Sequence, residues 1–473
     1  MHTLTTLWER HQPRIIAALV TALLLLLAYW GGFPERVPVT TLALGLAFLI
    51  IVVLFFGFLI YWFYISPLPE KEQRRLTIST PSPLVRQIVG LGAALAAVFI
   101  TLGLFWDELW HRLYGVGAVV DDFWWRPHLL LYAGMGINAL FAIGGMFIIM
   151  QRGKGTLRHR FRAEPLIGLL TLAAGFQIIT APFDPLWHQI FGIDLTAWSL
   201  PHLLLGLGLI SVMLASSSIQ FSLVPRRSWR FLGGLSLNEI LCILVLALAA
   251  TILFQFGTTE WEDLSPAMDP GYLVFQRPEW LYPVVLITVS AFISFTALHL
   301  LRRVGAATLI YLLTLGLRLI LMTTFNAAEA ANMSYKANLL VLVPVLAVDL
   351  YYAYRLRAGH IDSPRTPLIG SFVLAVATFI YALPLINQWL FYPRLSPIVL
   401  IGVFGFGLLM AAVTASAASR LGAWLRALGE TTPVEAQVPA AALQRLHWVG
   451  AGTLIAALAF IAVFIATATP PIT

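Results

Sequence analysis

Runs of about 20 consecutive apolar residues recur along the whole chain, and this feature restricts the fold more than any other. Each run is long enough to cross the hydrocarbon core of a bilayer, which is about 30 Å thick. A lipid-exposed segment must satisfy its backbone hydrogen bonds internally, so runs of this length fold as α-helices. Of the 473 residues, 59% are apolar and 11% are charged, which excludes a soluble globular domain. The sequence therefore predicts an all-α polytopic integral membrane protein in contact with the lipid bilayer.

Thirteen transmembrane helices are expected, joined by loops that hold no soluble domain of any size. They cover approximately residues 14–32, 39–65, 86–110, 127–150, 164–184, 200–222, 236–256, 280–301, 304–325, 337–355, 367–388, 396–419 and 446–468. We divide the chain into three regions. Residues 1–85 hold two helices and a cytoplasmic loop, residues 86–222 hold four helices, and residues 223–473 hold a bundle of about seven helices.

The distribution of positive charge predicts the orientation. If the N-terminus lies in the cytoplasm and the loops alternate sides, 22 of the 29 Lys and Arg residues are cytoplasmic, six are outside, and Arg318 lies within a span. Cytoplasmic loops are enriched in Lys and Arg, so this bias predicts an N-in, C-out topology. The net charge of +7 is then a topology signal rather than a sign of nucleic-acid binding. We expect an integral protein of a prokaryotic plasma membrane.

Two segments of the chain repeat one local pattern. FWDELWHRLYG begins at Phe105 and FDPLWHQIFG begins at Phe183, and both contain Asp-x-Leu-Trp-His-x-x-x-Gly. After a spacer, each continues as Trp-x-x-Pro-His-Leu-Leu-Leu, starting at Trp124 and Trp198. Two helices separate equivalent points, so both copies run in the same direction across the membrane. We interpret them as parallel repeats of one helical hairpin.

Each copy is expected to bring one acid and two histidines to the same depth. The acid and the first histidine are four residues apart in the last turn of a helix, so they share one helix face. The second histidine follows a proline in the first turn of the next helix, where proline is favoured. Both sets would lie near the outer membrane surface. The predicted ligands are Asp107, His111 and His128 in the first copy and Asp184, His188 and His202 in the second.

One carboxylate and two imidazoles form a three-ligand metal set that leaves room for exogenous ligands. Such a set suits copper, zinc or non-haem iron. The chain has ten histidines, and the four that fall on the predicted outer side all lie in the repeat at equivalent positions. This coincidence favours metal binding. The alternative that stays open is a hydrogen-bonded Asp–His clamp that caps each hairpin without a metal.

The order and spacing of these ligands resemble the C subunit of the particulate methane and ammonia monooxygenases, a family of copper membrane monooxygenases. That subunit carries two successive sets, each with an Asp or Asn, a His four residues later, and a second His at the start of the next membrane helix. The resemblance covers about residues 86–222 and implies two copper sites near the outer membrane face. This chain departs from that family in having two Asp residues, thirteen expected spans and no cupredoxin-like outer domain.

Three classes of function follow from the predicted sites. The first is a copper-dependent, monooxygenase-like membrane oxidoreductase or an accessory subunit of one. The second is a transporter or metal-handling permease that captures metal at the outer sites. The third is a structural subunit of a membrane complex. Other membrane subunits or a homo-oligomer are open as partners, and no nucleic acid is expected.

Two polar residues within the expected spans are costly to bury in a membrane. Arg318 and Asp349 should face the interior of the bundle, where they could pair with each other or line an ion path. The single cysteine, Cys242, lies in an apolar run, so one chain can form neither a disulfide nor a thiolate metal site.

Overall fold

The computed structural model describes residues 39–67, 83–114, 124–152, 155–191, 196–224, 228–262, 273–324, 335–430 and 440–468, together with Leu26, Tyr29, Trp30, Leu264, Pro266 and Gly271. Within these ranges every long element is an α-helix, and twelve helical segments are long and apolar enough to cross a membrane. The predicted all-α polytopic fold is therefore confirmed. The first expected span, 14–32, lies almost wholly outside the described residues.

The helices of the first half of the chain match the expected spans closely, with one exception. They are α2 (Val39–Ile60) with the π-helical turn η1 (Tyr61–Ile65), α4 (Pro83–Tyr114), α5 (Arg126–Arg152), α6 (Leu157–Ala163), α7 (Pro165–Thr180), α8 (Phe183–Phe191) and α9 (Leu200–Ser222). The exception is the expected span 164–184, which ends as α7 before Pro182. The chain then resumes as the short helix α8. Proline lacks a backbone N–H and clashes with the preceding helical turn, which explains the interruption.

The second half of the chain continues the same alternation of long helices. It contains α10 (Leu237–Glu262), η2 (Leu273–Gln276), α11 (Leu281–Leu301), α12 (Ala306–Thr324), α13 (Lys336–Arg357), α14 (Thr366–Trp389), α15 (Pro397–Glu430) and α16 (Ala440–Ala466). The strands in the described part of the chain are two residues long. β1 (Arg230–Phe231) pairs in parallel with β2 (Arg303–Val304) and ties the segment before α10 to the turn before α12.

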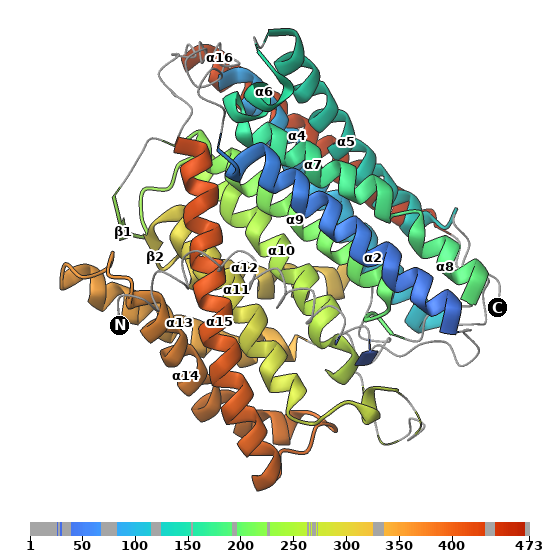
Figure 1. Cartoon of the computed structure of the whole chain (residues 1–473), viewed down its shortest axis with the longest axis vertical. Helices are drawn as coiled ribbons and strands as arrows, with labels where there is room; N and C mark the ends of the chain where they lie inside the picture. Colours follow the sequence, from blue (N-terminus) through green and yellow to red (C-terminus); the bar gives the residue numbers. More distant parts are fainter. Residues whose placement is uncertain are drawn as a thin grey trace.

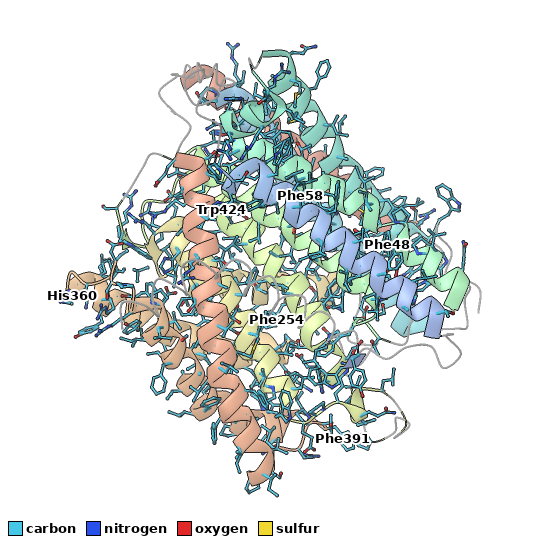
Figure 2. The ribbon with its side chains drawn as sticks, in the orientation of Figure 1. Phe48, Phe58, Phe254, His360, Phe391 and Trp424 are labelled. Atoms are coloured by element: carbon cyan, nitrogen blue, oxygen red, sulfur yellow. The ribbon has the colours of Figure 1, made fainter. Side chains whose placement is uncertain are left out.

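The helices form one continuous bundle in which α9 and α10 lie side by side between two groups (Figure 1). On one side, α4 packs against α5 and α9, and α7 packs against α5 and α9. On the other side, α11 packs along α15, and α13 packs along α14. Figure 2 shows Phe254 of α10 near the middle of the bundle, where it is buried. The four helices of residues 86–222 thus contact the remaining helices chiefly where α9 packs against α10. The three-region division of the chain stays a prediction.

Two buried charged side chains in the bundle have partners on neighbouring segments. Asp349 of α13 accepts hydrogen bonds from the backbone N–H groups of Gly305 and Thr308, each at 2.7 Å, and from the Thr308 hydroxyl. Arg318 of α12 instead donates to Gln255 of α10 and lies 4.9 Å from the ring centre of Phe105 on α4. The direct pair between Arg318 and Asp349 that the sequence allowed therefore does not form.

Several arginines of the expected cytoplasmic side satisfy helix ends. Arg162 donates to the backbone oxygen of Phe63 at 2.7 Å, at the end of η1. Arg160 donates to the backbone oxygen of Met150 at 2.7 Å, near the end of α5. The last carbonyl groups of a helix lack intrahelical partners and attract cations. The basic segment that indicated topology in the sequence thus also caps two helices.

Candidate metal centre

The second copy of the repeat is held in place by the apolar face of α8. Trp187 is buried against α2 and α9, in a cluster with Leu49 and Leu200. A side chain at Gly45 of α2 would collide with the Trp187 ring, so the glycine makes room for it. With Trp187 anchored, the adjoining face of α8 presents the polar residues Asp184 and His188, which are one turn apart.

The start of α9 supplies the third predicted ligand. Pro201 lies in the first turn of α9, where its missing N–H costs nothing, and His202 follows it. His202 Nε2 lies 3.3 Å from Asp184 Oδ1, and His188 Nε2 lies 3.7 Å from the same oxygen. The two imidazole rings are perpendicular, with centres 6.0 Å apart. Thus one carboxylate oxygen faces the Nε2 atoms of both histidines.

These distances fit a single metal ion. One ligand atom from each of Asp184, His188 and His202 lies within 4.8 Å of the other two. Two ligands at about 2.0–2.1 Å from a tetrahedral metal are about 3.3–3.4 Å apart, so small side-chain movements would complete the coordination. The side chains are 19%, 11% and 26% exposed, respectively, which leaves access for a further ligand.

The tautomer of His202 is decided by a backbone contact. His202 Nδ1 lies 3.3 Å from the carbonyl oxygen of Thr196. A carbonyl can only accept, so Nδ1 carries a proton, and in the neutral ring Nε2 then holds the lone pair that a metal ion requires. Metal-bound histidines have this arrangement, with the second ring N–H donated to an acceptor.

The first copy of the repeat is only partly described. Asp107 and His128 do come together, with His128 Nε2 at 2.9 Å from Asp107 Oδ1. The ring of His128 also stacks on Trp125, with ring centres 6.0 Å apart. The side chain of His111 lies outside the described residues. The first predicted ligand set is thus brought together for two of its three members.

The two copies differ in how their second helix begins. Trp198, which precedes His202 by four residues, is 2% exposed and donates from its ring to the backbone oxygen of Phe256 at 2.6 Å. Trp124, at the equivalent position before His128, is 68% exposed. The tryptophan before the second site is therefore part of the core of the bundle, whereas its counterpart before the first site lies at the surface.

Sequence reasoning did not identify the groups that support the second site. The backbone of Thr196 and Ala197, Glu260 at the end of α10, and Arg277 all lie next to it. The repeated Trp-x-x-Pro-His pattern pointed to Trp198 but to none of these.

No protein-family model, curated protein or solved structure matches the chain, so the function must be argued from its own residues.

Proposed function

We propose that the chain is a membrane protein that binds a transition-metal ion at Asp184, His188 and His202, and that this ion is copper. The observation that carries the proposal is the convergence of the three side chains on one point, with the carboxylate oxygen 3.3 Å and 3.7 Å from the two Nε2 atoms. Copper is the choice indicated by the resemblance of the ligand spacing, and zinc and iron are the alternatives. We propose the same role for Asp107, His111 and His128.

Each residue of the second site would contribute differently to binding the ion. Asp184 supplies the negative charge that offsets the charge of the cation. His188 and His202 supply neutral nitrogen ligands from two different helices, so the ion would tie α8 to α9. Bound copper would provide one-electron redox chemistry and reaction with O₂. The partial exposure of the three ligands leaves access for such a further ligand, and together with the resemblance of the ligand spacing it favours a monooxygenase-like oxidoreductase or an accessory subunit of one.

The first experiment is to purify the full chain in mild detergent without chelator and to measure bound metals by mass spectrometry. The variants are His202→Ala and His128→Ala, and His360→Ala is the matched control because His360 lies in the exposed turn between α13 and α14. We expect at least one copper per chain, lost from the second site in His202→Ala and retained in His360→Ala. Removing a ligand from a three-ligand site should abolish stoichiometric binding.

Other outcomes separate the alternatives. Zinc or iron at the same stoichiometry and with the same dependence on His202 would keep the site and reject copper. Absence of metal after incubation with Cu, Zn and Fe salts would reject metal binding and leave the Asp–His contacts as structural clamps. If copper is bound, O₂ consumption by the purified protein tests the oxidoreductase. Copper uptake into proteoliposomes without O₂ consumption would favour a permease.

A further inference from the structure

A buried ion pair lies directly behind the second site, at the end of α10. Arg277 Nη1 is 2.6 Å from Glu260 Oε2, and the two side chains are 1% and 8% exposed. The guanidinium group also lies over two indole rings, 4.1 Å from the centre of Trp198 and 4.9 Å from that of Trp261. Ions buried to this degree are stable only when paired and well positioned. The position of the Glu260 carboxylate is therefore sharply defined.

The same carboxylate reaches the metal ligands through one peptide group. The other oxygen, Glu260 Oε1, accepts a hydrogen bond from the backbone N–H of Ala197. The carbonyl of the same peptide group, that of Thr196, accepts the hydrogen bond from His202 Nδ1. A trans peptide group is planar, with its N–H and C=O pointing in opposite directions. The carboxylate, the peptide and the imidazole thus form one continuous chain of hydrogen bonds.

Such a chain should affect the metal ligand in two ways. When a carboxylate accepts a hydrogen bond from the N–H of a peptide group, it polarises that group and makes its carbonyl oxygen a stronger hydrogen-bond acceptor. A stronger acceptor at Nδ1 makes the imidazole a better electron donor at Nε2 and holds the ring in its ligating orientation. In many metal sites a carboxylate contacts the histidine directly, whereas here a peptide group stands between them.

We infer that Glu260 is a positioning residue of the metal centre, acting on His202 through the Thr196–Ala197 peptide and held in place by Arg277. This inference rests on the proposed metal site and adds to it the group that tunes its affinity. The arginine is itself fixed by two backbone contacts. Its Nε donates to the carbonyl oxygen of Trp30 at 3.1 Å, and its own carbonyl accepts from Tyr392 at 2.6 Å. Burial raises the pKa of Tyr392 to about 12, so the hydroxyl keeps the proton that it donates.

The test compares Glu260→Gln with Glu262→Gln, using Cu(II) as the probe. Both residues are buried acids at the end of α10, but Glu262 accepts a hydrogen bond from Tyr282. Cu(II) affinity is measured by chelator competition on the full-length detergent-purified chain, and the electron paramagnetic resonance spectrum reports the ligand field. Loss of a supporting carboxylate typically weakens metal binding by about 10–100-fold. We expect a loss in this range and an altered spectrum for Glu260→Gln, with the affinity of Glu262→Gln within about twofold of the native chain.

Three results would overturn the inference. Equal losses in both variants would indicate a general structural effect of the cluster. Native affinity in Glu260→Gln, with binding at the second site lost in His202→Ala, would reject the role of Glu260 and leave the metal site intact. Absence of Cu(II) binding by the native chain would reject both. If Glu260→Gln does not fold, Glu260→Asp keeps the charge opposite Arg277 but shortens the reach to Ala197. Weakened binding in that variant supports the inference, and native affinity contradicts it.

Discussion

Asp349 illustrates how a single acidic residue can be stable inside a membrane bundle. Its two carboxylate oxygens accept from two backbone N–H groups and one hydroxyl at the start of α12, all at 2.7 Å. The first N–H groups of a helix have no intrahelical acceptor, so a side chain that supplies one stabilises the helix end. Here the capping residue comes from the neighbouring helix α13 rather than from the chain just before α12. The contact therefore stabilises a helix and a helix pair together.

Replacing Asp349 with Ala should destabilise the protein measurably. The substitution leaves two buried N–H groups without their acceptors, and each such loss costs about 1–3 kcal/mol. We expect the free energy of unfolding to fall by at least about 2 kcal/mol, measured by denaturation in mixed detergent micelles. The control is Leu350→Ala at the next position, where the side chain is 62% exposed. Its effect should be below about 0.5 kcal/mol, and an equal loss in both variants would contradict the capping role.

At the scale of helices, packing depends on positions where two backbones meet. A side chain at Gly422 of α15 would overlap the backbone of Thr296 on α11, and one at Gly103 of α4 would overlap the backbone of Leu131 on α5. Small residues at such positions let membrane helices approach closely, since lipid offers little hydrophobic force between them. The two most extensive helix contacts of the bundle are therefore each built around a glycine.

Gly422 and Gly405 provide a matched pair within α15. Nothing lies within 4 Å of a side chain placed at Gly405, whereas at Gly422 the obstacle is backbone, which cannot move aside. We expect Gly422→Val to separate α11 from α15 and to cost about 3 kcal/mol or more, because overpacking against rigid neighbours is strongly destabilising. Thermal stability in detergent and monodispersity on a sizing column measure the effect. Gly405→Val should resemble the native chain, and similar losses in the two variants would reject the packing argument.

For the whole molecule, the ends of successive helices alternate between two faces. Figure 2 shows His360, in the turn after α13, and Phe391, just after α14, at opposite ends of α14. The distribution of Lys and Arg predicts that His360 faces the cytoplasm and Phe391 the outside. The same assignment places Asp184, at the start of α8, on the outer face. Determining which face of the bundle is cytoplasmic therefore also determines on which side of the membrane the metal site lies.

Cysteine labelling answers this question directly. The native Cys242 is fully buried, so it should contribute little background. With a membrane-impermeant maleimide on intact cells, we expect labelling of Phe391→Cys and none of His360→Cys until the membrane is permeabilised. Charge bias in short loops is the physical reason for this expectation. The reverse pattern would place the candidate metal site at the cytoplasmic face.

The sequence by itself determined the number and order of the described spans and the pairing of Asp184 with His188 on one face. Both follow from local physics, because apolar length and backbone hydrogen bonding in lipid act within one segment, and i, i+4 neighbours always share a face. The break at Pro182 was also within reach of the sequence, since proline disrupts a helix wherever it occurs inside one. The expected span ended at residue 184, four residues beyond the end of α7 at Thr180.

Only the tertiary structure decided which distant groups meet. Asp349 caps α12 instead of pairing with Arg318, and Glu260 reaches Ala197 across 63 positions of the chain. No local pattern encodes such contacts, because they depend on how helices rotate and slide against each other to fill space. The same packing buried Trp198 and left Trp124 exposed, although the two occupy equivalent places in the repeated sequence. Similar local sequences thus acquired different surroundings because their neighbours in the bundle differ.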